Sequence, residues 1–267
     1  SWRLFYHKML DKKVSSTIKA SALIPDTKVL LSEWDLALRV TENLERARHQ
    51  NIFGKGSRSR IEDILTIFRQ RYFTDPTVGM MLVTLVQRAA PSAWVDPLLY
   101  FFAAQNDRTL RDLVVEALYP RQQAGYSDAP VEYVTRTIRD WVDEGKTTTL
   151  WNEATITRVA QGGLATLRDF GVLQGKVHKQ IAPFYLPTPV FVLVAHWLQG
   201  RERSGERVLH SDEWKLFLLP VSGVERFFVE AHQEHLLVYQ AAGSVIRIDF
   251  PTADLMEYAN VLLESAR

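Results

Sequence analysis

Most of the chain follows a helical pattern, in which apolar residues recur every three or four positions. The first clear stripe consists of Leu36, Val40, Leu44 and Ala47. It predicts a helix that Ser32 caps and that runs to about Gln50. The glycine-containing segment 51–57 then breaks the pattern. A second helix follows, and the S-x-x-E spacing of Ser59 and Glu62 predicts a capping box at its start.

Further helices are predicted before the middle of the chain. Their expected starts are Asp75, Pro91 and Asp107. The segment 119–130 then combines two prolines, a glycine and several polar residues, which is typical of a domain boundary. We therefore predict an N-terminal helical domain over residues 1–120 and a second domain over residues 121–267.

The second half of the chain combines helices with short β-hairpins. A helix over about 155–170 is followed by Gly171, which suits a left-handed C-terminal cap, and by two extended stretches around a turn at Gly175. A second block repeats this order, with a helix over about 222–235 and a strand pattern in 244–250. We predict a mainly α fold, with a helix-turn-helix in the N-terminal helical domain and a winged-helix-like C-terminal domain with short β-hairpins.

Composition narrows the possible classes of protein. The 267 residues, 46% of them hydrophobic, suffice for two domains with sizeable cores. The absence of cysteine excludes disulfides, a cysteine nucleophile and thiolate metal sites. No uncharged apolar segment reaches the roughly 18 residues that span a bilayer, and the first ten residues lack the apolar core of a signal peptide. We therefore expect a cytoplasmic protein with no membrane partner.

The net charge of +1 conceals an uneven distribution. Lys and Arg exceed Asp and Glu by 6 in residues 1–73 and by 2 in residues 150–185. Acidic residues exceed basic ones by 3 in residues 74–149 and by 4 in residues 186–267. Local basic density sets the field that a phosphate backbone meets, so this distribution favours a nucleic-acid partner. A basic helix surface that only faces solvent gives the same counts.

A basic, hydroxyl-rich segment opens the helix that follows the glycines. It contains Lys55, Ser57, Arg58, Ser59 and Arg60. A helix N-terminus presents unpaired backbone N–H groups and a partial positive charge, both of which attract phosphate. Because another helix ends shortly before, the order is that of a helix-turn-helix whose second helix enters the major groove of DNA. The alternative is a capped helix start that only faces solvent.

A second basic group accompanies the helix over about 155–170. Its members are Thr148, Arg158, Lys176, His178 and Lys179. Off the main apolar stripe of the helix we expect Arg158, Gln161, Thr166 and Arg168. The last three members of the group lie at or near the hairpin tip. This is the layout of a winged helix, with the helix in the major groove and the wing along the backbone. The alternative is a helix and a hairpin that pack together only for burial.

Known catalytic motifs are missing from the sequence. It contains no G-x-S-x-G, no nucleotide-binding phosphate loop and no H-E-x-x-H. His232 and His235 lack a third metal ligand and are interpreted as surface histidines, whereas His196 is interpreted as a core residue. We expect no enzymatic activity, no catalytic residue, no cofactor, no metal and no small-molecule substrate. A nuclease stays an alternative, because acidic residues distant in sequence can meet in space.

Several segments together resemble one known family. They are 98–102 (LLYFF), 158–175 (RVAQGGLATLRDFGVLQG), 185–187 with 190–191, 214–218 (WKLFL), 224–226 with 230–232, and 239–251 (YQAAGSVIRIDFP). Over about residues 30–251 the chain resembles the BrxA family of the bacteriophage exclusion (BREX) systems of bacteria.

The resemblance implies a largely helical antiphage-defence protein, encoded beside a DNA methyltransferase and large ATPases. It implies binding of double-stranded DNA without catalysis, and other BREX proteins as further partners. The basic helix start of the family matches Lys55 to Arg60. We expect contacts mainly to the phosphate backbone, because few residues are obvious base readers. The competing hypothesis is a protein–protein adaptor that assembles other BREX components through the acidic C-terminal surface.

Overall fold

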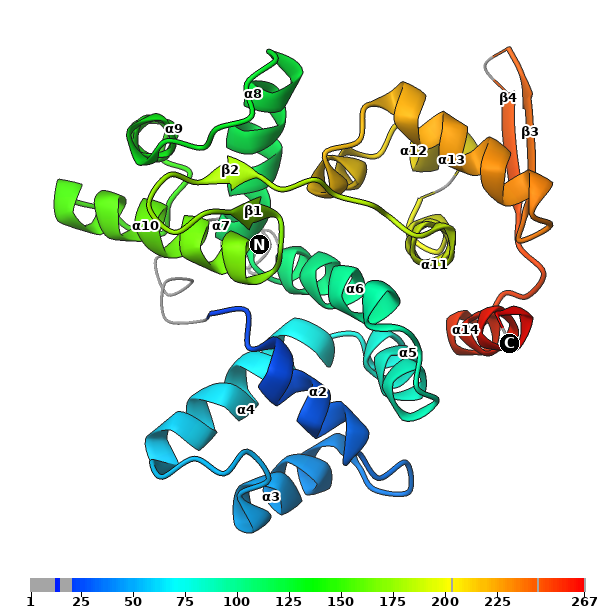
Figure 1. Cartoon of the computed structure of the whole chain (residues 1–267), viewed down its shortest axis with the longest axis horizontal. Coiled ribbons are helices and arrows are strands. Elements are labelled where there is room, and N and C mark those ends of the chain that lie inside the picture. The colour runs from blue at the N-terminus through cyan, green and yellow to red at the C-terminus, as the bar shows by residue number, and fades with distance from the viewer. Residues whose placement is uncertain (1–12, 15–20, 203, 244, 267) are drawn as a thin grey trace, which may run out of the picture. The chain divides into compact units, whose positions relative to one another are not determined.

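The computed structural model describes residues 13–14, 21–202, 204–243 and 245–266 (Figure 1). This part of the chain is mainly helical and carries two small antiparallel β-hairpins, which confirms the predicted fold class at that level. Among its helices, none combines the length and the apolar character that crossing a membrane requires.

The chain forms two compact units, each assembled from separate segments. Unit 1 contains the described parts of Ser1–Ala22, Ala103–Phe184 and Lys215–Leu218. Unit 2 contains the described parts of Leu23–Phe102, Tyr185–Trp214 and Leu219–Arg267. The boundary that we predict between residues 120 and 121 falls within α8, inside unit 1, and the two-domain division at that point stays a prediction.

Unit 1 is built around one long helix, α10. Its elements are α7 (Arg108–Asp112), the π-helical segment η2 (Leu113–Leu118), α8 (Tyr119–Gln123), α9 (Val131–Asp143), α10 (Glu153–Asp169), β1 (Leu173–Gln174) and β2 (Gln180–Ile181). The apolar stripe of α10 is buried, as predicted, and packs against α7, α9 and β1. An added Cβ at Gly163 would lie 2.2 Å from Leu113 Cδ1, so the glycine lets α10 approach η2 closely.

The first hairpin follows α10 directly. Gly171 adopts a φ of 81°, the left-handed conformation predicted for the end of this helix. Leu173 pairs with Ile181 across the hairpin. A third extended segment joins on the other side, because Asp128 forms an antiparallel bridge with Gln180. The hairpin is therefore held on both sides of β2.

Unit 2 contains the remaining helices and the second hairpin. Its elements are α2 (Ile24–Ser32), α3 (Val40–Gln50), α4 (Arg58–Tyr72), α5 (Pro76–Gln87), most of α6 (Ser92–Gln105), α11 (Thr188–Gln199), α12 (Gly205–Leu209), part of the 3₁₀ segment η3 (Asp212–Phe217), α13 (Val221–Gln233), β3 (Val238–Ala242), β4 (Val245–Asp249) and α14 (Leu255–Ser265). Helix α5 packs against both α2 and α14. The order α13, β3, β4 confirms the predicted second helix–hairpin block.

Two predictions about helix starts are wrong. Ser32 is the last residue of α2, and α3 begins only at Val40. The Asn43 side chain bonds both the N–H and the C=O of Asp35 at 2.8 Å, which favours a turn before α3 and leaves Leu36 60% exposed. Helix α4 is capped by Ser57 rather than by a box at Ser59.

Candidate nucleic-acid interface

The start of α4 presents two arginines that pair with no carboxylate of the described residues. Ser57 has an extended backbone, and its Oγ accepts a hydrogen bond from the Arg60 N–H at 3.4 Å. The side chains of Arg58 and Ser59 are exposed, and that of Arg60 is partly exposed. Within the described part of the chain, neither arginine has an ion-pair partner. Both guanidinium groups are thus free to meet an anion.

The loop before α4 is fixed by its own hydrogen bonds. The Asn51 side chain accepts from the Lys55 N–H and donates to the Lys55 C=O, each at 3.0 Å. Asn51 and Gly54 both adopt left-handed conformations, which such a tight turn requires. The Lys55 ammonium forms an ion pair with Asp26 of α2 at 2.9 Å, so a phosphate would have to compete with that carboxylate. Among the predicted contacts at this site, Lys55 is the least available.

Helix α10 carries one arginine, Arg158, for which the described part of the chain supplies no countercharge. Its two acidic residues are both engaged: Glu153 pairs with Arg139 of α9 at 2.8 Å, and Asp169 pairs with Arg168 at 2.7 Å. The hydrogen bond from Arg139 also lowers the pKa of Glu153. Arg158 is exposed and has no ion-pair partner within the described residues. The middle of α10 therefore presents an uncompensated positive charge.

The first hairpin presents further cations at its tip. Gly175 adopts a φ of 88°, and Lys176, Val177 and His178 follow it on the surface. Val177 is 77% exposed, although it is apolar. The Lys179 ammonium donates to the Lys176 C=O at 3.3 Å and is only partly exposed. Lys176 is consequently the more available of the two lysines.

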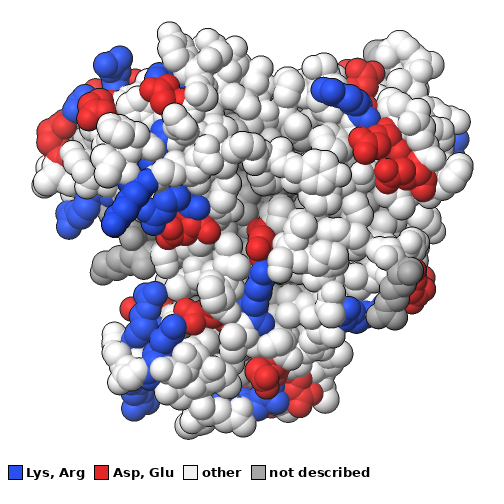
Figure 2. Space-filling model, in the orientation of Figure 1, with Lys and Arg blue, Asp and Glu red and all other residues white. Residues whose placement is uncertain are grey.

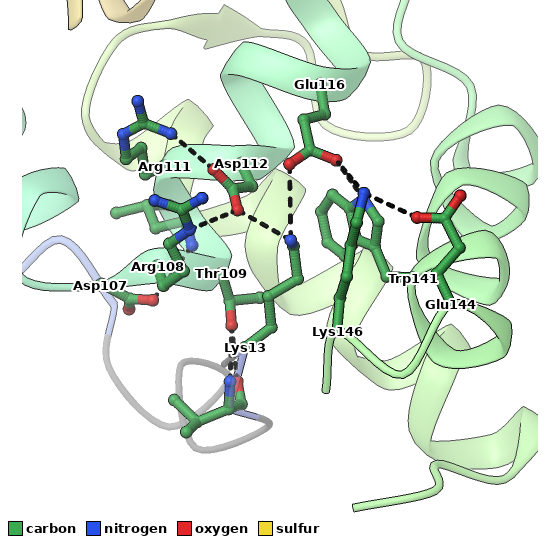
Figure 3. Close-up of polar contacts among 12 residues, drawn as sticks. Lys13, Asp107, Arg108, Thr109, Arg111, Asp112, Glu116, Trp141, Glu144 and Lys146 are labelled. Atoms are coloured by element: carbon green, nitrogen blue, oxygen red, sulfur yellow. Dashed lines mark hydrogen bonds and ion pairs between the residues drawn. The ribbon is translucent and has the colours of Figure 1, made fainter. Parts of the chain in front are cut away.

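A buried ionic cluster supports the turn between α9 and α10 (Figure 3). The Lys13 ammonium lies 2.8 Å from Asp112 and 3.5 Å from Glu116, and 4.4 Å from the centre of the Trp141 ring. Asp112 also pairs with Arg108 at 2.7 Å and Arg111 at 2.8 Å. Lys13 is 2% exposed and Asp112 is 0% exposed. The buried Asp112 carboxylate therefore pairs with three cations, which are Lys13, Arg108 and Arg111.

The backbone of Lys13 holds that turn in place. Its N–H donates to the Lys146 C=O at 3.0 Å, and its C=O accepts from the Thr148 N–H at 3.0 Å. The Thr148 side chain remains exposed, so only its hydroxyl is available to a ligand. Nothing in the local sequence identified Lys13 as a buried residue. It counts instead among the basic residues of segment 1–73, as does Arg71, which is 4% exposed.

The predicted contacts fall into two groups, one in each unit. Lys55 to Arg60 belong to unit 2, whereas Thr148, Arg158 and the hairpin residues belong to unit 1. Lys and Arg side chains lie over α4 in unit 2 and over the α10 region in unit 1, in each case with Asp and Glu interspersed (Figure 2). Two other residues singled out in the sequence are less available, since Thr166 is buried and Arg168 is paired.

Two of the described histidines, His196 and His232, form hydrogen bonds within unit 2. His196 is partly buried, with Nε2 2.9 Å from the Thr252 C=O, and burial lowers its pKa. His232 accepts a hydrogen bond from the Tyr239 N–H through Nδ1 at 3.4 Å. A search of the described residues finds no group of three or more histidine, aspartate or glutamate side chains that is arranged to hold a metal ion.

Comparison with family models places the chain in a known family. The model named BrxA matches residues 14–196, which is more than half of the chain. The chain belongs to the BrxA family. Membership of the BrxA family suggests a component of a BREX system and supports a role in phage defence. A comparison with curated proteins finds no match.

The ionic cluster of this BrxA-family chain predicts a large effect of Lys13 on stability. Lys13→Met should lower the free energy of unfolding by about 1.5–3 kcal/mol, because it removes one of the three cations that surround the buried Asp112 carboxylate. Lys146→Met is the matched control: its ammonium pairs with the exposed Glu144 at 2.6 Å and should cost less than about 1 kcal/mol. Chemical denaturation measures both. Equal losses would contradict the central position assigned to Lys13.

The hairpin turn gives a second prediction. At Gly175 an added Cβ would lie 2.1 Å from the His178 C=O oxygen, and φ is 88°. Gly175→Ala should therefore destabilise unit 1 by about 2–4 kcal/mol, from strain and clash together. Gly171→Ala, with φ of 81° and no atom within 4 Å, should show only the strain, about 1 kcal/mol. Thermal or chemical unfolding measures the stability of both variants. A larger loss of stability for Gly171→Ala than for Gly175→Ala would contradict the predicted clash at Gly175.

Proposed function

We propose that this chain is a non-enzymatic, double-stranded-DNA-binding component of a BREX phage-defence system, and that it binds mainly through the phosphate backbone. The observation that carries the proposal is a set of exposed cations without ion-pair partners among the described residues. Among them are Arg58, Arg158 and Lys176, which are exposed, and Arg60, which is partly exposed. A phosphate backbone would supply the missing countercharge, and the release of its counterions would drive binding.

In unit 2, the proposed DNA-binding element is a helix-turn-helix formed by α3 and α4. Arg48 of α3 pairs with Glu62 of α4 at 2.6 Å, which supports a fixed angle between the helices. The ordered loop 51–57 provides the turn. Arg58 and Ser59 then lie at the start of the second helix, where unpaired N–H groups favour a phosphate.

In unit 1, the proposed element is a winged helix. Helices α9 and α10 pack together and lead into the β1–β2 hairpin. The bridge between Asp128 and Gln180 supports this proposal, because it adds a third extended segment, from just before α9, to the proposed wing. In this arrangement α10 enters the major groove, and Lys176, His178 and Lys179 follow the backbone. The Thr148 hydroxyl donates to a phosphate beside the start of α10.

A second candidate function rests on the C-terminal helix–hairpin block. Helix α13 and its C-cap residue expose Glu225, Glu230 and Glu234, which would repel phosphate. The same block exposes apolar side chains, among them Val229 and Val245. An acidic surface with exposed apolar groups suits a protein partner, and this observation favours an adaptor between BREX components.

Charge reversal distinguishes specific cations from a general charge effect. Arg58→Glu with Arg60→Glu should lower affinity for a mixed-sequence duplex by about 10- to 100-fold at 0.1 M salt, because two phosphate contacts are lost. The matched control is Arg226→Glu with Arg247→Glu, the same charge change on exposed residues of the acidic block. It should have a much smaller effect. Fluorescence anisotropy at several salt concentrations measures both affinity and salt slope.

Three outcomes would count against this proposal. Equal losses in the two double variants would indicate only a diffuse effect of net charge. Affinity that does not change between low and physiological salt would rule out backbone binding. Intact defence by the Arg58/Arg60 double variant, together with retained binding of purified BREX partners, would favour the adaptor.

The proposal that the chain is not an enzyme predicts that it does not cleave DNA. Supercoiled plasmid incubated with the chain and Mg²⁺ or Mn²⁺ should remain supercoiled, because the described residues contain no recognisable metal-binding group. Gel electrophoresis after prolonged incubation measures this. Nicking that persists through a second purification step, and that depends on the metal, would assign nuclease activity.

A further inference from the structure

Helix α10 exposes a narrow stripe that its packing within unit 1 does not use. The stripe includes Ala154, Arg158, Gln161, Gly162 and Ala165, all exposed or partly exposed. The opposite side of the helix is buried. Only two of these five side chains are long, so the small residues would let a groove wall approach the helix while Arg158 and Gln161 extend beyond them.

The two long side chains are both uncommitted. The acidic residues of α10 already pair with Arg139 and Arg168, and no hydrogen bond or ion pair from the described residues engages the Arg158 or Gln161 side chain. Gln161 adds no charge, so attraction to phosphate does not account for it. A side-chain amide offers a donor and an acceptor side by side, which matches the edge of a base.

On the basis of the DNA binding proposed above, we infer that Arg158 and Gln161 read base edges in the major groove. The Arg158 guanidinium donates two hydrogen bonds to O6 and N7 of a guanine. The Gln161 amide accepts from N6 and donates to N7 of an adenine. This assigns a sequence preference to a protein whose affinity comes mainly from phosphate contacts, because positioning and base reading are separate contributions.

Helix geometry limits the sites that fit. Residues three apart along an α-helix are separated by about 4.5 Å of rise, while base pairs stack every 3.4 Å or so. Arg158 and Gln161 therefore reach two adjacent base pairs, or two base pairs with one other pair between them. The preferred duplex contains a G·C pair and an A·T pair at that spacing.

Selection from a randomised duplex library, using the full chain at fixed salt, tests the inference. The wild-type chain should enrich a motif with the G·C and A·T pairs at that spacing. Arg158→Ala should abolish the preference for guanine and Gln161→Ala the preference for adenine. Each should reduce discrimination against the wrong base by roughly 5- to 150-fold, the range of one bidentate contact.

Two further measurements separate base reading from charge. Arg158→Lys keeps the charge but loses the planar fork, so it should keep the salt slope and weaken the guanine preference without abolishing it. Placing 7-deazaguanine in the selected site removes the N7 acceptor and should weaken the wild-type chain but not Arg158→Ala. Lys176→Ala is the control for a phosphate contact. It should weaken binding to all duplexes alike and reduce the salt slope by about 1.

The failures of the two ideas are distinguishable. If the wild-type chain binds no duplex at any salt concentration, DNA binding and base reading are both overturned. If it binds DNA with a steep salt dependence but enriches no motif, only base reading is overturned. The same holds if it enriches a motif that Arg158→Ala and Gln161→Ala leave unchanged.

Discussion

The structure of unit 1 depends on the ion pairs that the buried Asp112 carboxylate forms. A carboxylate removed from water costs several kcal/mol unless cations and hydrogen bonds replace its hydration. Here Lys13, Arg108 and Arg111 all lie within 2.8 Å of it. Glu116 shares the Lys13 ammonium and accepts from the Trp141 indole N–H at 2.7 Å (Figure 3). The cluster is complete only when residue 13 lies against η2, so a residue distant in sequence becomes part of the core.

This constraint extends to the surface that we propose for DNA binding. Lys13 bonds the backbone on both sides of Thr147, and so fixes the turn from which α10 starts. On the hairpin side, Arg121 pairs with Asp128 at 2.6 Å, and Asp128 bridges to Gln180. Both ends of the α10–hairpin element are thus held by interactions inside unit 1. A surface fixed before binding loses less conformational entropy when a ligand arrives, which favours affinity.

The sequence predicts features that depend on neighbours along the chain. The stripe of α10, the cap at Asp75 and the left-handed Gly171 are all local, and all are confirmed. The failures involve more distant contacts. Residues 32–39 carry a helical pattern, but the amide of Asn43 stabilises a turn there. The burial of Lys13 depends on a partner about a hundred positions away, which no local window contains.

The same reasoning explains how much of the candidate site could be predicted. The exposure of Arg158 follows from the helical period, whereas the pairing of Lys55 with Asp26 depends on how α2 packs. The two helix–hairpin blocks differ in how their charged residues are paired. In α10 both acidic residues are neutralised by arginines, which leaves Arg158 in excess. Helix α13 and its C-cap residue instead expose three glutamates beside a similar hairpin. The pairing of charges, rather than the order of helix and hairpin, therefore decides which block suits a polyanion.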